Sequence, residues 1–71
     1  MKGGDNITLN VERFRKEQGL TQKELAEKLN VTQGAISMFE KGDRMPSMKT
    51  LVKLSKVFGV SLDDLIGKES A

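Results

Sequence analysis

The feature that most constrains this chain is a pair of capped helices separated by a turn of only a few residues. Thr21 and Glu24 form a capping box, in which the hydroxyl and the carboxylate each accept a backbone N–H at a helix start. Asn30 follows this helix and tolerates the left-handed conformation that ends helices. Thr32 is then the N-cap of the next helix. Residues 20–41 are therefore predicted to form a tight helix-turn-helix unit.

Apolar residues at helical spacing predict three further helices. The first covers residues 7–18, with Ile7 on its apolar face and Asp5 or Asn6 as its N-cap. The other caps and stops are Gly19, Gly42, Ser47, Gly59 and Ser61, which leave apolar helical series at 22–29, 33–41, 51–58 and 62–66. No stretch alternates with the period of a strand, so the expected class is all-α, a compact bundle of five short helices.

The 71 residues leave room for one domain. Residues 1–6 carry two glycines and no periodic apolar signal, so we expect a flexible leader, a folded domain over 7–67 and a tail at 68–71. No signal peptide or membrane span is apparent in the sequence. The expected location is therefore the cytoplasm of a bacterium, including one expressing a phage gene.

The chain has no His and no Cys, which removes the commonest general base, metal ligand and nucleophile. No catalytic triad, metal set or phosphate loop is recognisable, so we expect no enzyme, no cofactor, no metal and no small-molecule ligand. The net charge is only +2, but residues 21–56 contain seven Lys and Arg and four acidic residues, a local excess of +3. This basic middle region favours a nucleic-acid partner.

A series of short motifs covers residues 9–66. They are Phe14-Arg15, Gly19-Leu-Thr-Gln22, Leu25-Ala26, Leu29-Asn-Val31, Ile36-Ser37, Phe39-Glu40, Gly42, Pro46-Ser47 and Leu62-Asp-Asp-Leu65. In order and spacing they resemble the Cro/repressor-type (XRE-like) helix-turn-helix family, the lambda repressor-like DNA-binding domains. The resemblance implies a sequence-specific regulator of transcription. Its second motif helix, the recognition helix, would enter the major groove of double-stranded DNA.

The resemblance also implies roles for individual residues. Gln33 is the expected principal base reader, because a glutamine amide pairs bidentately with adenine. Gln22 is expected to contact a phosphate and to brace the Gln33 amide. The expected base contacts are Gln33, Gly34, Ser37 and Met38, and the expected backbone contacts are Gln22, Lys23, Thr32, Lys41, Arg44 and Lys49.

Gly34 and Met38 depart from the family pattern, which often has polar side chains at these positions. Gly34 offers no side chain, which allows close approach to the bases or to a thymine methyl group. Met38 offers only van der Waals contact. Specificity is therefore expected to depend on Gln33, on thymine methyl groups and on DNA shape.

Two further expectations are structural. Arg15 and Glu40 match a family pair that joins the first helix to the recognition helix by a salt bridge. Leu62, Leu65 and Ile66 in the last helix are candidate contacts of a homodimer, with core packing as the alternative for each and expected for at least one.

Two functions remain open from the sequence. The leading one is a repressor that binds a palindromic operator as a dimer. The alternative is a protein-interaction module on the same fold, such as an antitoxin-like or partner-binding regulator, which Gly34 and Met38 favour. Gln22, Gln33 and the basic excess favour DNA.

Overall fold

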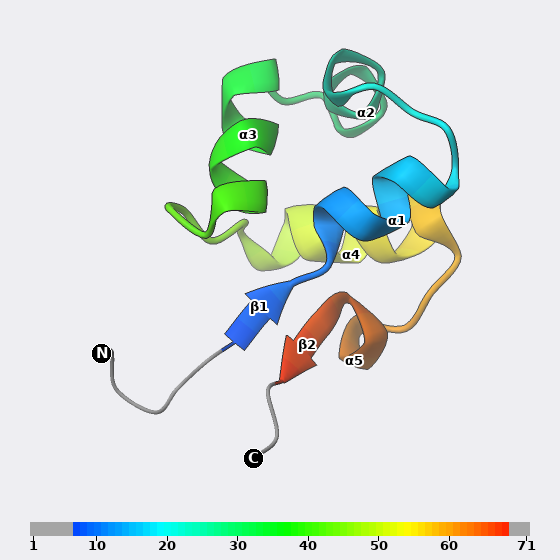
Figure 1. Ribbon diagram of the computed structural model, residues 1–71, viewed down its shortest axis with the longest axis vertical. Coiled ribbons are helices and arrows are strands. Elements are labelled where there is room, and N and C mark those ends of the chain that lie inside the picture. The colour runs from blue at the N-terminus through cyan, green and yellow to red at the C-terminus, as the bar shows by residue number, and fades with distance from the viewer. Residues whose placement is uncertain (1–6, 69–71) are drawn as a thin grey trace.

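The computed structural model describes residues 7–68 as five helices and two short strands. In chain order these are β1 (Ile7–Leu9), α1 (Val11–Glu17), α2 (Gln22–Leu29), α3 (Gln33–Lys41), α4 (Met48–Phe58), α5 (Leu62–Leu65) and β2 (Ile66–Lys68). Helices α2 and α3 lie at one end of the molecule, and the two strands lie at the opposite end (Figure 1). The mostly helical five-helix class predicted from the sequence is confirmed.

The predicted caps at the two ends of α2 and at the start of α3 are confirmed. The Thr21 hydroxyl accepts the Glu24 N–H at 3.0 Å, and the Glu24 carboxylate accepts the Thr21 N–H at 2.9 Å. Asn30 ends α2 in the left-handed region, with φ 60° and ψ 45°. The Thr32 hydroxyl accepts the Ala35 N–H at 3.0 Å and so caps α3. The turn between the two helices is therefore fixed by side chains at both of its ends.

The predicted start of the first helix is wrong. Helix α1 begins at Val11, and Ile7 belongs to β1. Strand β1 pairs antiparallel with β2, with Ile7 opposite Lys68 and Leu9 opposite Ile66. Ile66 therefore belongs to a strand and not to the last helix. The proposed caps at residues 5 and 6 lie outside the described residues.

Asn10 explains why the chain changes from strand to helix at this point. Its backbone N–H donates to the Leu65 carbonyl at 2.9 Å, and its side-chain amide donates to the Asp64 carbonyl, also at 2.9 Å. Both bonds tie the start of α1 to the end of α5. Partners so far apart in sequence leave no trace in local hydrophobic periodicity.

A single core fills the space between the helices. Its members are buried apolar side chains from every helix: Val11, Phe14, Leu25, Ala26, Leu29, Ile36, Phe39, Leu51, Leu54, Phe58 and Leu65. The Phe14 and Phe58 rings meet at 5.7 Å between centroids, which joins α1 to α4. No helix among residues 7–68 has the length and apolar character needed to cross a membrane.

Candidate nucleic-acid interface

Helix α3 has one side inside the protein and one side outside it. The inner side buries Ile36 and Phe39, and α3 makes its main packing contact with α2. The outer side consists of exposed or half-exposed residues at helical spacing: Gln33, Gly34, Ser37, Met38 and Lys41. All four expected base contacts lie on this outer side. The residues expected to read DNA are thus together on one surface.

A largely buried ion pair fixes α3 to α1. The Arg15 Nε donates to Glu40 Oε2 at 2.6 Å, and the Arg15 Nη2 donates to Glu40 Oε1 at 3.4 Å. The side chains are only 11% and 6% exposed. Arg15 also donates from Nη1 to the Leu20 carbonyl at 2.9 Å, which ties down the segment before α2. The two residues paired by family resemblance are therefore in contact, and the guanidinium joins three parts of the fold.

The Gln22 side chain extends this network in a way that the sequence did not predict. Its Nε2 donates to Glu40 Oε1 at 2.9 Å. No hydrogen bond joins Gln22 to Gln33 within residues 7–68, so the expected bracing of the Gln33 amide is not present here. Glu40 instead holds the Gln22 amide, leaving its carbonyl oxygen and second N–H for other partners. No local sequence pattern indicated this contact, because Gln22 and Glu40 are 18 positions apart.

The remaining expected backbone contacts lie on α2, on α3 and the residues beside it, and on α4. Lys23, Lys41, Arg44 and Lys49 are exposed, and none of them pairs with an acid among the described residues. Thr32 is exposed, and its hydroxyl oxygen already accepts the capping bond. A hydroxyl that accepts one bond can still donate its own hydrogen, including to a phosphate.

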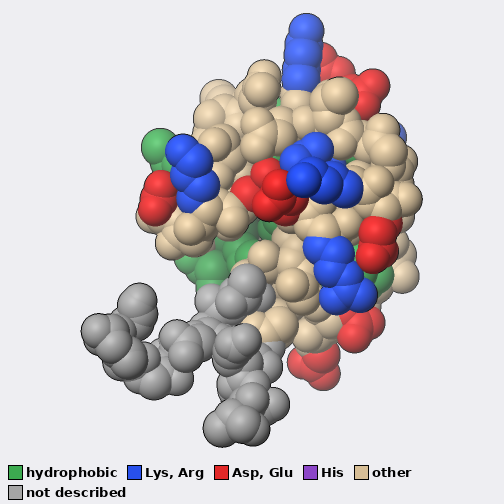
Figure 2. Space-filling view, in the orientation of Figure 1, with side chains coloured by type: hydrophobic (Ala, Val, Ile, Leu, Met, Phe, Trp, Pro, Cys, Tyr) green, Lys and Arg blue, Asp and Glu red, His purple; other side chains and the backbone are tan. Residues whose placement is uncertain are grey.

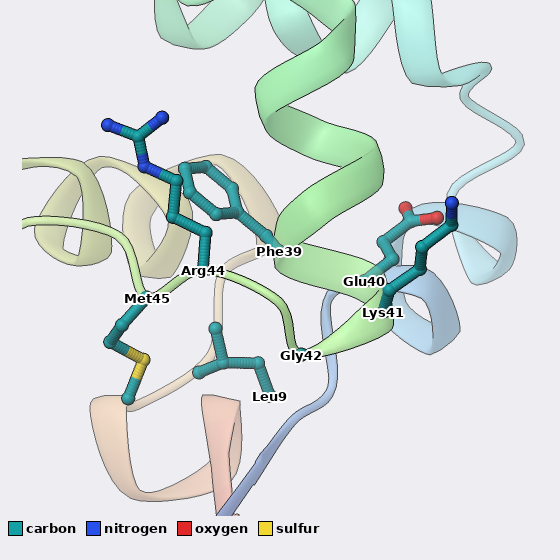
Figure 3. A pocket seen from close by; sticks show the side chains of 7 residues that line it. All are labelled: Leu9, Phe39, Glu40, Lys41, Gly42, Arg44 and Met45. Atoms are coloured by element: carbon teal, nitrogen blue, oxygen red, sulfur yellow. The ribbon is translucent and has the colours of Figure 1, made fainter.

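Lys41 and Arg44 border a shallow pocket at the C-terminal end of α3 (Figure 3). Leu9, Phe39 and Met45 form the apolar part of its lining. The two basic side chains lie on opposite sides of this pocket and extend away from Leu9 and Met45.

The basic side chains do not form a continuous patch on the face seen in Figure 2. Lys and Arg side chains are separated by acidic groups and by uncharged surface. A ligand on this face would meet spaced positive charges, which matches the small net charge of +2.

The three candidate dimer contacts differ in their exposure. Leu65 is 0% exposed and belongs to the core, so it is unavailable to a second subunit. Leu62 and Ile66 are half-buried and pack against the core from outside. More exposed apolar side chains occur elsewhere, at Met45 and Met48, which are 53% and 65% exposed. The sequence pattern did not single out these two methionines, because lone apolar residues near a loop carry no periodicity.

Comparisons with known proteins agree with this arrangement. The helix-turn-helix family model matches residues 11–65. The chain therefore belongs to the XRE-type helix-turn-helix family.

One relative is an uncharacterised HTH-type transcriptional regulator of Bacillus subtilis, YqaE. It is 43% identical over 61 residues, which are 86% of this chain and 53% of YqaE. The chain thus spans about half the length of this curated relative.

Two of the solved structures that resemble this chain are complexes with DNA. The P22 c2 repressor in complex with a synthetic operator matches with a TM-score of 0.77 and 30% identity, over 80% of this chain and 86% of that one. The biofilm regulator SinR in complex with DNA matches with a TM-score of 0.72 and 37% identity, over 79% of this chain and 90% of that one.

Proposed function

We propose that this chain binds double-stranded DNA by placing the outer side of α3 in the major groove, and that it represses transcription by occupying an operator. The observation that carries this proposal is the exposure of the outer side of α3. Gln33, Gly34 and Met38 are exposed, whereas the inner side is held by the core and by the buried ion pair. A helix fixed on one side and unoccupied on the other can enter a groove without rearrangement.

The first residue of the outer side carries a side chain that can recognise a base. Gln33 is the first residue of α3, and no described residue forms a hydrogen bond with its side chain. Its amide can therefore present one donor and one acceptor to adenine N7 and N6. Ser37, one turn further, adds a hydroxyl that can bond a base or a phosphate.

The surrounding residues supply phosphate contacts. Lys41 is the last residue of the outer side, Arg44 follows α3 in the chain, and Lys23 lies in the first turn of α2. Each neutralised phosphate releases counterions, so operator affinity is expected to fall steeply with salt concentration.

Recognition of a two-fold operator requires two copies of the chain. We propose a homodimer on DNA, with half-site centres separated by one helical turn, about 34 Å. Leu62 and Ile66 remain candidate contacts, because part of each side chain is exposed and available to a second subunit.

The test is selection from random duplex DNA, followed by sequencing of the bound fraction. Wild-type protein should enrich a motif of two related half-sites, and Gln33→Ala should lose the enrichment while remaining folded. Val52→Ala is the matched control, because Val52 is an uncharged, exposed residue of α4. Absence of binding at low salt would contradict the proposal and favour a protein-interaction module, for which exposed Met38 would be the first candidate contact.

A further inference from the structure

Gly34 lies in the middle of the outer side of α3. With about 100° of rotation per residue, Gln33 falls on one flank of this side and Met38 on the other. Gly34 lies between them, nearly in line with Lys41 two turns further on and about 60° around the helix from Ser37. The centre of a helix face is the part that comes nearest to the floor of a groove. The residue expected to approach DNA most closely is thus the one without a side chain.

Nothing within the described protein requires glycine at this position. The backbone of Gly34 is not in the left-handed region, unlike those of Gly19, Gly42 and Gly59. A Cβ atom added to Gly34 would meet only the Thr32 hydroxyl oxygen, at 3.9 Å, which is ordinary van der Waals contact. Alanine would fit and would favour the helix, since glycine is among the poorest helix formers. The glycine therefore costs stability without any packing reason.

We infer that Gly34 determines specificity by leaving a notch for the 5-methyl group of a thymine. This inference rests on the proposed function and names the base that the notch accepts. Gln33, Ser37 and Met38 lie on the same face of α3. Beyond the chain neighbours of Gly34 and the backbone of its own helix, only the Thr32 hydroxyl oxygen comes within 4 Å of the place where a Cβ atom would be, so a methyl group has room there.

The chemistry of the major groove supports this choice. The thymine methyl is the alkyl group that base pairs present there, and the other groups at the base edges are hydrogen-bond donors and acceptors. Gly34 offers no side-chain donor or acceptor to match them. Met38, which is 44% exposed, supplies a flexible apolar wall that can pack against a methyl group. An alanine at position 34 would place its own methyl group where the thymine methyl would lie.

The test uses the operator recovered by selection, with each thymine replaced in turn by deoxyuridine, which lacks only the methyl group. For wild-type protein, one replacement in each half-site should weaken binding by about fourfold, the value of one buried methyl-sized group. Gly34→Ala should bind the thymine operator more weakly and should bind the uridine and thymine forms equally. It should also unfold at a higher temperature than wild type, which excludes misfolding as the cause.

Val52→Ala is again the control, because it changes an exposed helical residue without changing charge and should keep the wild-type ratio of thymine to uridine binding. Two results would overturn the inference alone: a wild-type protein indifferent to every uridine replacement, or a Gly34→Ala variant that keeps the wild-type ratio. Failure to enrich any operator would instead overturn the proposed function, and this inference with it.

Discussion

The inner and outer sides of α3 are made of neighbouring residues, yet they differ in how their groups are partnered. On the inner side, Glu40 accepts three hydrogen bonds, two from Arg15 and one from Gln22. On the outer side, Gln33 and Met38 are exposed and Gly34 has open space above it. The inner side therefore stabilises the fold, and the outer side is available for a ligand. Substitutions on the two sides should have separable effects.

The largest expected effect is on the inner side. Glu40→Ala leaves the largely buried Arg15 guanidinium with the Leu20 carbonyl as its remaining hydrogen-bond partner among the described residues. Removal of one member of a fully buried ion pair costs about 3–5 kcal/mol, so the loss here should approach that range. This is a large part of the 5–15 kcal/mol that stabilises a typical domain. Denaturant unfolding should show the loss, whereas Gln33→Ala should unfold near the wild-type midpoint. Equal midpoints for these two variants would end the distinction between the sides.

The outer side should respond in binding and not in stability. Gln33→Ala removes the proposed bidentate base contact, which is worth about 1–3 kcal/mol of discrimination against the wrong base. Fluorescence anisotropy with the selected operator should show this loss, while the unfolding midpoint stays unchanged. A Gln33→Ala variant with full operator affinity would show that α3 does not read bases through this amide.

The turn before α3 offers an intermediate test. Asn30 has a left-handed backbone, which costs roughly 1–2 kcal/mol for a residue such as alanine and is easy for glycine. Asn30→Ala should therefore be less stable than Asn30→Gly by about this amount in thermal or denaturant unfolding. If the two variants were equally stable, the backbone conformation would not be what limits this turn.

The proposed phosphate contact of Lys41 should produce a smaller and sequence-independent change. Lys41→Ala should weaken binding to all duplexes about equally and should reduce the slope of log affinity against log salt by about 1. Lys56→Ala on α4 is the matched control and should leave the slope unchanged. A sequence-selective loss in Lys41→Ala would instead place Lys41 among the base contacts.

The smallest effect concerns an exposed ion pair, which sets a scale for the buried one. A hydrogen bond from Lys16 and its charge lower the pKa of the Glu12 carboxyl below the ordinary value of 4.5. A group whose pKa is lower in the folded state than in the unfolded state stabilises the protein at pH values above its unfolded-state pKa. This stabilisation is lost as the pH falls through its folded-state pKa. Glu12→Gln should lower the melting temperature slightly at pH 7 and less at pH 3. If Glu12→Gln lowered the stability at pH 7 as much as Glu40→Ala does, burial would not be what makes the Arg15–Glu40 pair important.

The sequence predicted the helical parts of the fold well. Residues such as Thr21, Thr32 and Asn30 act on backbone groups within a few positions, so their effect can be read from the chain itself. Leu65 shows the limit of this reading. Its spacing fitted both a dimer contact and the core, and only the packing of α5 decided for the core.

The strand pair and the Glu40 network could not be read from local patterns. Ile7 continued an apolar helical series, yet its segment pairs with Ile66–Lys68. The Arg15–Glu40 pair was expected from family resemblance, but the bond from Gln22 to Glu40 was not. Each of these contacts joins residues distant in the chain, which local periodicity does not register.

The sequence by itself determined the five helices, the short turn before α3 and the residues that begin α3, because capping and periodicity act over a few residues. Tertiary structure alone decided where the first helix begins, which partner the Gln22 amide takes and that Gly34 faces open space. These depend on segments that meet only when the core closes. The physical reason is that hydrogen bonds and packing between distant segments form where the folded chain places them, whatever the local pattern favours.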